Sequence, residues 1–169
     1  LDGALLSWQE AYRLAPTDLE LATSIGDLLI RHNDRLDEAL AIYTRVLSER
    51  PENLRLQVLI GTIHERRERW TDAAQAYRSA LAIDPNQVRA RSSLGVVLFK
   101  QGEYEAAGHE LRKAIELSPR DLRSRVFSGL SQNHLGKYED ALDELKEALL
   151  IDPHAANQIL GVREQIPHF

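Results

Sequence analysis

Apolar residues recur along this chain with the spacing of amphipathic helices, and prolines interrupt them at regular intervals. In the middle of the sequence, the pattern predicts one helix over 88–101 and a second over 104–117, with a turn at Gly102–Glu103. Pro119 then stops the second helix, because proline cannot continue the backbone hydrogen bonding. The residues that place the second helix's apolar face at i, i+4 and i+7 are Ala107, Leu111 and Ala114.

This helix pair repeats at a constant interval along the chain. The prolines that follow successive second helices are Pro51, Pro85, Pro119 and Pro153. Small residues occupy two further columns, which are Gly26, Gly61, Gly95 and Gly129 in the first helices and Ala39, Ala73, Ala107 and Ala141 in the second. Because these residues carry little or no side chain, the two helices of each unit can approach closely. Several columns in register over four copies indicate an internal repeat.

These columns resemble the tetratricopeptide repeat (TPR) family. The segment LGVVLFKQGEYEAAGHELRKAIELSP, ending at Pro119, is close to a full family motif, and GKYEDALDELKEALLIDP, ending at Pro153, matches its second half. The resemblance covers nearly the whole chain. It implies an all-α, right-handed superhelical solenoid of antiparallel helix pairs, in which the first helices line a concave groove that binds other proteins.

The repeat columns also predict how the chain is divided. We expect four repeats flanked by half a repeat and by a polar cap. The expected segments are 1–16 as the second helix of a truncated repeat, 17–51, 52–85, 86–119 and 120–153 as repeats, and 154–169 as a C-terminal capping helix. Since the first segment lacks its partner helix and the sequence has no initiating Met, we expect a fragment of a longer protein.

Composition narrows the function classes. The 169 residues include no cysteine, so disulfides, thiolate metal sites and cysteine nucleophiles are absent, and the net charge of −5 argues against bulk binding of nucleic acid. No apolar run has the length of a membrane span. The compartment is not identified: the cytoplasm is slightly favoured, and the periplasm stays open. The excess of 17 arginines over 4 lysines is typical of a GC-rich, bacterial genome.

No motif predicts catalysis. The six histidines never stand at i, i+4, and no nucleophile elbow, phosphate-binding loop or dinucleotide fingerprint is present. His64 occupies a core column that holds Leu29 and Leu98 in other repeats, so we interpret it as a packing residue. The sequence therefore predicts a protein that is not an enzyme and that has no metal or cofactor site.

Charge is unevenly distributed between the two kinds of helix. The predicted first helices over 19–32, 54–67, 88–101 and 122–135 carry −1, +2, +3 and +2, or +6 together, which leaves −11 for the rest of the chain. Two basic columns cause this, and eleven residues separate them, so both fall on one helical face. The candidate groove residues are Arg55, Arg66, Arg89, Val96, Phe99, Lys100, Arg123, Val126, Leu130 and Asn133.

These residues predict a groove for a partner segment that carries acidic and apolar residues. Two alternative interpretations concern these residues. In one, the arginines are ordinary solvated charges paired with neighbouring acids. In the other, the last first helix, which has Ser128 and Gln132 in apolar columns, is only weakly packed and forms no pocket. Two others concern the function: the chain is a recruitment domain of a larger enzyme or of a secretion or biogenesis machine, or it is a self-assembly module in which Trp8 lies on an uncovered face.

Overall fold

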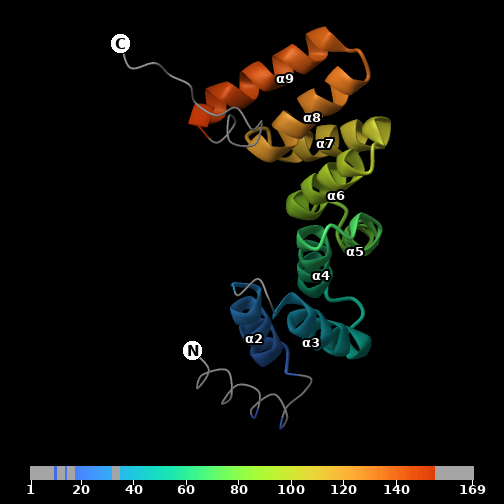
Figure 1. Cartoon of the computed structure of the whole chain (residues 1–169), viewed down its shortest axis with the longest axis vertical. Coiled ribbons are helices and arrows are strands. Elements are labelled where there is room, and N and C mark those ends of the chain that lie inside the picture. The colour runs from blue at the N-terminus through green and yellow to red at the C-terminus, as the bar shows by residue number, and fades with distance from the viewer. Residues whose placement is uncertain (1–9, 11–13, 15–17, 32–34, 155–169) are drawn as a thin grey trace. The chain divides into compact units, whose positions relative to one another are not determined.

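In the computed structural model, the described residues are Glu10, Leu14, 18–31 and 35–154, and within them the regular secondary structure is helical, α-helical except for a 3₁₀ residue at Arg35 (Figure 1). The all-α prediction is therefore confirmed for this part of the chain. The expected capping helix, Trp8 and nearly all of the expected first half-repeat lie outside the described residues. The helices are α2 (Leu19–Arg31), α3 (Leu36–Glu49), α4 (Leu54–Arg66), α5 (Trp70–Ile83), α6 (Val88–Lys100), α7 (Tyr104–Leu117), α8 (Leu122–His134) and α9 (Tyr138–Ile151).

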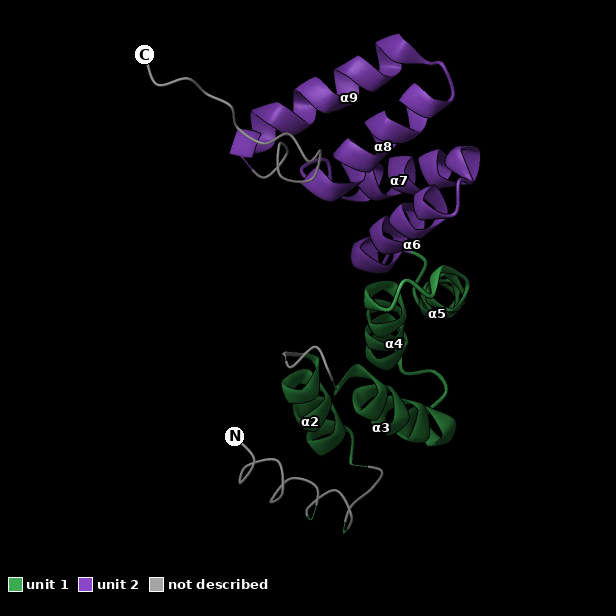
Figure 2. Ribbon diagram, viewed as in Figure 1, with its two compact units in different colours: residues 1–85 green, residues 86–169 purple. Residues whose placement is uncertain are grey.

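The chain divides into two compact units, residues 1–85 and residues 86–169, which are coloured separately in Figure 2. In the first unit, α2 packs on α3 and α4 packs on α5, while α3 and α4 connect the two pairs. In the second unit, α6 packs on α7 and α8 on α9, while α8 also contacts α6 and α7. Each unit is thus built from two antiparallel helix pairs with a shared interior.

Side-chain caps fix where the first helix of three pairs begins. The Asn53 side chain accepts a hydrogen bond from the Leu56 amide at 3.0 Å and so satisfies a free donor of α4. Gln87 caps α6, and Asp121 caps α8 in the same way.

The turns inside the pairs need a left-handed residue, which Gly102 (φ 81°) and Gly136 (φ 75°) supply without steric cost. Gly102 confirms the turn expected from the sequence at that position. Glu68 adopts the same conformation (φ 55°) at the corresponding turn of the first unit, although it has a side chain.

The glycine column marks the closest approach of paired helices. A Cβ atom on Gly95 would lie 2.5 Å from Cγ of the buried Leu111 on α7. Gly61 faces the Tyr77 ring in the same way, at 2.6 Å, and Gly26 faces the ring of Tyr43. The alanines of the second column, Ala39, Ala73, Ala107 and Ala141, are all buried.

Candidate partner-binding surface

The two candidate groove arginines of the first unit contact the preceding repeat. Arg55 on α4 lies 3.5 Å from the Asp27 carboxylate on α2. Nη1 of Arg66 donates a hydrogen bond to the Ile30 carbonyl at 2.9 Å, near the end of α2, where the helix has free acceptors. Both arginines therefore connect one repeat to the next, although both side chains are exposed.

Asp27 also orders the interior of this unit. The Tyr43 hydroxyl donates a hydrogen bond to Asp27 at 3.3 Å. Burial, and then the neighbouring Asp27 charge, raise the pKa of Tyr43 well above its usual range. The phenol consequently stays protonated at neutral pH and remains a donor to the carboxylate that also contacts Arg55.

The second unit leaves its basic residues more available. Arg89 and Lys100, at opposite ends of α6, are exposed, and neither side chain has a hydrogen-bond or ion-pair partner in the described part of the chain. Arg123 on α8 is half-buried, and its Nη1 donates to Oγ of Ser93 at 3.1 Å. The three arginines of this column thus differ in their neighbours: Arg55 contacts a carboxylate, Arg89 is exposed, and Arg123 bonds to a serine.

A polar cluster fixes α6 against α8. The Ser92 hydroxyl donates to the Asp121 carboxylate at 2.8 Å, and the Ser124 hydroxyl donates to Ser92 at 2.8 Å. Asp121 also accepts from the amide of Ser124, and this bond caps α8, while the Ser124 hydroxyl oxygen lies against the same carboxylate. Because both serines are buried, each hydroxyl needs such a partner. The cluster holds the two first helices of this unit in one arrangement.

Four rings gather beside this pair of helices. The Phe99 ring on α6 lies 5.4 Å from Phe127 on α8 and 5.4 Å from Tyr104 on α7, both edge-on. His134 stacks on Tyr104 at 4.2 Å with an interplanar angle of 3°. We call these four residues the aromatic cluster. His134 is exposed and the other three are half-buried, so the cluster combines packing with accessible ring surface.

Two of the predicted apolar anchors lie in the interior instead. Val96 is 3% exposed and Val126 is 0% exposed. Val126 packs with Ala148 of α9, and Leu130 lies partly buried beside it. Val96 and Val126 therefore belong to the packing between helices. Neighbouring helices cover more of the surface of α6 and α8 than the positions on a single helix predicted. Asn133, at the end of α8, is exposed.

The polar residues in apolar columns of α8 are also enclosed. Ser128 is fully buried, and its Oγ has no hydrogen-bond partner among the described residues, nor does the buried Oε1 atom of Gln132. An unsatisfied buried polar atom costs free energy. This face of α8 is accordingly less favourably packed than the corresponding face of α6, where Leu94 and Leu98 are buried.

Comparison with known families and structures agrees with this architecture. Two family models, both described as Tetratricopeptide repeat, match residues 23–88 and 60–128. The chain belongs to the tetratricopeptide repeat family. No curated protein sequence matches it significantly. Members of this family generally mediate protein–protein interactions and generally lack enzymatic activity.

Solved TPR structures share the fold at low sequence identity. A crystal structure of MamA superposes with a TM-score of 0.83 and 20% identity, covering 92% of this chain and 91% of that one. MamA from Desulfovibrio magneticus RS-1 gives 0.81 and 19%, covering 90% and 86%. YrrB, described as a TPR protein with an unusual peptide-binding site, gives 0.78 and 21%, covering 95% and 82%. At such identities the likeness concerns the fold alone.

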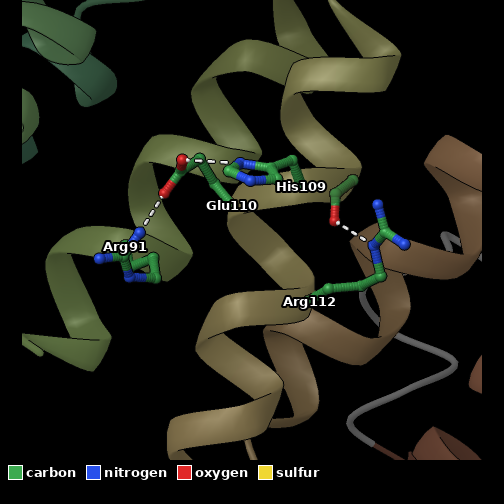
Figure 3. Close-up of polar contacts among 5 residues, drawn as sticks. Arg91, His109, Glu110 and Arg112 are labelled. Carbon is green, nitrogen blue, oxygen red and sulfur yellow. Dashed lines mark hydrogen bonds and ion pairs between the residues drawn. The ribbon is translucent and has the colours of Figure 1, made fainter.

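Two ion pairs hold the TPR helix pairs of the second unit together. Nη1 of Arg91 on α6 lies 2.5 Å from the Glu110 carboxylate on α7, and Glu110 also contacts His109 (Figure 3). Nη1 of Arg125 on α8 lies 2.7 Å from Glu144 on α9. All four charged side chains are mostly buried.

The sequence contains a signal for these two pairs. Arginine precedes glutamate at the same separation in both pairs, and the second pair stands one repeat after the first. The helical wheel places the two arginines away from the groove face, but it does not identify the acids that pair with them, because those acids lie on another helix.

His64 is enclosed in the first unit, as expected of a packing residue. Its side chain is 15% exposed, and Nδ1 lies 3.8 Å from the Asp72 carboxylate. Burial lowers the pKa of the imidazole below its ordinary value, while Asp72 opposes this shift and Arg69 adds to it. The folded protein therefore favours the neutral ring.

This shift predicts a pH-dependent stability. Because the unfolded chain binds the proton at higher pH than the folded chain, stability present above about pH 6.5 is lost as the pH falls below it. We expect the urea midpoint to fall more steeply between about pH 7.5 and 5.5 in the parent than in His64→Leu, which restores the residue type of Leu29 and Leu98. Parallel midpoint curves for the two proteins would contradict this.

The described residues contain no group of three or more His, Cys, Asp or Glu side chains placed to hold a metal ion. Nor does the described part of the chain include a helix with the length and apolar character needed to cross a membrane.

Proposed function

We propose that the second unit binds an extended segment of a partner protein, one that carries acidic and apolar residues. The binding surface is formed by Arg89, Lys100 and Arg123 together with the aromatic cluster. The observation that carries this proposal is the contrast between the units. All four side chains are exposed, but Arg55 and Arg66 each have a contact with the preceding repeat, whereas Arg89 and Lys100 lack partners among the described residues.

The geometry of α6 sets the spacing of the partner's acidic residues. Eleven residues separate Arg89 from Lys100, which corresponds to about 16 Å along a helix and a rotation of about 20° past three turns. An extended segment covers that distance in about five residues. Phe99 precedes Lys100 directly, so an apolar side chain near the second acid would reach the aromatic cluster. The preferred partner has two acids about five residues apart, with an apolar residue beside one of them.

The buried polar cluster supports binding by keeping the surface ordered. Ser92, Ser124 and Asp121 fix α6 against α8 through hydrogen bonds of 2.8 Å. Since Arg89 lies on α6 and Arg123 on α8, the arrangement of their helices exists before a partner arrives. Because the surface is already ordered, binding carries a smaller entropic cost.

A charge-reversal experiment tests the proposal. The parent selects peptides from a displayed library of random nine-residue segments, and we expect enrichment of acids at i and i+5 with an adjacent apolar residue. Affinity for a selected peptide, measured by fluorescence anisotropy, should fall at least about tenfold in Arg89→Glu/Lys100→Glu. Because these charges are exposed, higher salt should also weaken binding.

Matched controls separate this surface from general charge. Lys113→Glu/Arg120→Glu makes the same change of charge at exposed positions outside the surface, so it should leave affinity nearly unchanged. Arg55→Glu should also have little effect, because that side chain already contacts Asp27. Equal loss in all three variants, or no loss in Arg89→Glu/Lys100→Glu, contradicts the proposal. Circular dichroism establishes that each variant retains its helix content.

A further inference from the structure

The His134 side chain has a ring face on which no other ring packs within the described residues. Its imidazole stacks on the Tyr104 ring, with 4.2 Å between the centroids and an interplanar angle of 3°. The Phe99 ring lies 5.4 Å from Tyr104 and 5.6 Å from His134 and is edge-on to both. Because Phe99 is nearly equidistant from the two stacked rings, it lies beside the stack. The outer face of the imidazole, opposite Tyr104, is therefore left open by these rings.

Exposure and hydrogen bonding also leave this imidazole available. Tyr104 is half-buried and His134 is exposed, so the imidazole is the outer member of the stack. Neither of its ring nitrogens has a hydrogen-bond or ion-pair partner in the described part of the chain. The side chain thus offers a ligand an apolar ring face and, at the edge of that ring, polar atoms that are not already bonded.

The stack stands at the same end of the second unit as Lys100. His134 is the last residue of α8 and Tyr104 is the first of α7, so both adjoin the turns inside the helix pairs (Figure 1). Lys100 is the last residue of α6 and directly follows Phe99. The helix α9 finishes at Ile151, at the opposite end of its pair. The open imidazole therefore adjoins the basic end of the proposed binding surface.

The corresponding residues of the first unit cannot form this stack. Leu36 and Arg66 stand where the second unit has Tyr104 and His134. Leu36 is buried and has no ring, and Arg66 donates a hydrogen bond to the Ile30 carbonyl. The open ring face is therefore a property of the second unit, and the packing of a repeat does not require it.

We infer that the apolar residue of the partner segment is aromatic and that its ring stacks on the open face of His134. This inference rests on the proposed function, which requires only an apolar residue near the acid that meets Lys100. Paired rings gain attraction beyond the area that they bury, and an aliphatic side chain gains none of it. The acid beside that aromatic residue can then accept a hydrogen bond from the imidazole N–H as well as from Lys100.

Two fluorescein-labelled peptides of nine residues test the inference on the full chain. Both carry aspartate at positions 2 and 7, and position 8 is phenylalanine in one and cyclohexylalanine in the other. The two side chains have similar size, and the saturated ring has no less apolar surface, but only phenylalanine has π electrons. Anisotropy should give an affinity about threefold to tenfold higher for the phenylalanine peptide. This preference should vanish in His134→Leu and return in His134→Phe, which restores a ring.

The stack also has a spectroscopic signature. In proton NMR, the imidazole resonances of His134 should move upfield when the phenylalanine peptide binds, because they enter the shielding region above its ring. The cyclohexylalanine peptide should move them much less. His109 provides the control, since its side chain is exposed on α7 and lies outside the binding surface. The spectrum of His134→Leu, which lacks these resonances, assigns them.

The outcomes separate this inference from the proposed function. Equal affinity for the two peptides, a preference that persists in His134→Leu, or unmoved His134 resonances would overturn the inference alone, provided that Arg89→Glu/Lys100→Glu still loses both peptides. Binding that survives in Arg89→Glu/Lys100→Glu, or no binding of either peptide to the parent, would overturn the proposed function and the inference together. A single-stranded oligonucleotide that displaces the peptide and shifts the His134 resonances would assign the open face to base stacking, and this result also contradicts the inference.

Discussion

Replacing Gly95 with leucine is expected to lower the free energy of unfolding by about 3 kcal/mol or more. Even the first added atom, Cβ, would lie 2.5 Å from Leu111 Cγ and 3.3 Å from the Ala107 carbonyl oxygen. Leu111 is fully buried and cannot move aside without disturbing its neighbours. The helices α6 and α7 would therefore be forced apart. Urea denaturation followed by circular dichroism measures the loss, and hydrogen exchange shows whether it is concentrated in these helices.

Gly108, on the partner helix α7, provides the matched control. A Cβ atom on Gly108 would have no heavy atom within 4 Å outside its own helix and its chain neighbours. Gly108→Ala should consequently stabilise the protein by about 0.5 to 1 kcal/mol, because alanine loses less backbone entropy in a helix. Gly95→Ala should instead destabilise it, since the close contact begins at Cβ. Identical midpoints for the two alanine variants would disprove the close-packing argument.

Breaking the ion pair of Arg91 and Glu110 should have the other large effect. The two side chains are only 12% and 18% exposed, with 2.5 Å between Nη1 and the carboxylate. Glu110→Leu would leave the guanidinium in the interior without this carboxylate, which we expect to cost about 3 kcal/mol of unfolding free energy. The double variant Arg91→Leu/Glu110→Leu should recover most of that loss, because an apolar pair carries no desolvation penalty.

The double-mutant cycle in urea measures this coupling directly. Asp143→Asn provides an exposed comparison, because its pair with Lys146 has side chains that are 78% and 60% exposed. That change should alter stability by less than about 0.5 kcal/mol. Additive effects of Arg91→Leu and Glu110→Leu would show that the ion pair contributes nothing beyond the two separate side chains.

The sequence predicted the helices and turns of the described repeats closely. The predicted helix over 88–101 is α6 at Val88–Lys100, and the predicted helix over 104–117 is α7 at Tyr104–Leu117. This agreement has a local cause. Helix periodicity, capping side chains and the left-handed glycine at Gly102 act within a few residues of one another, so one repeat contains all the information.

The binding residues were harder to predict, because equivalent columns do not have equivalent neighbours. Arg55 and Arg123 share a column. Arg55 lies close to Asp27, on the first helix of the preceding repeat, whereas the residue in the same position before Arg123 is Val96. Arg123 bonds to Ser93 instead. Whether an arginine is free or engaged depends on a residue in the preceding repeat, and the helical wheel of one helix does not include it.

The sequence by itself determined the family, the all-α class and the small residues at the helix crossings, since each follows from a regular repeat of local patterns. Tertiary structure alone decided which side of each first helix stays open. It buried Val96 and Val126 and gathered Phe99, Tyr104, Phe127 and His134 into one cluster. The physical reason is that several neighbouring helices pack against each first helix. Which of its residues stay exposed to solvent therefore depends on contacts between repeats.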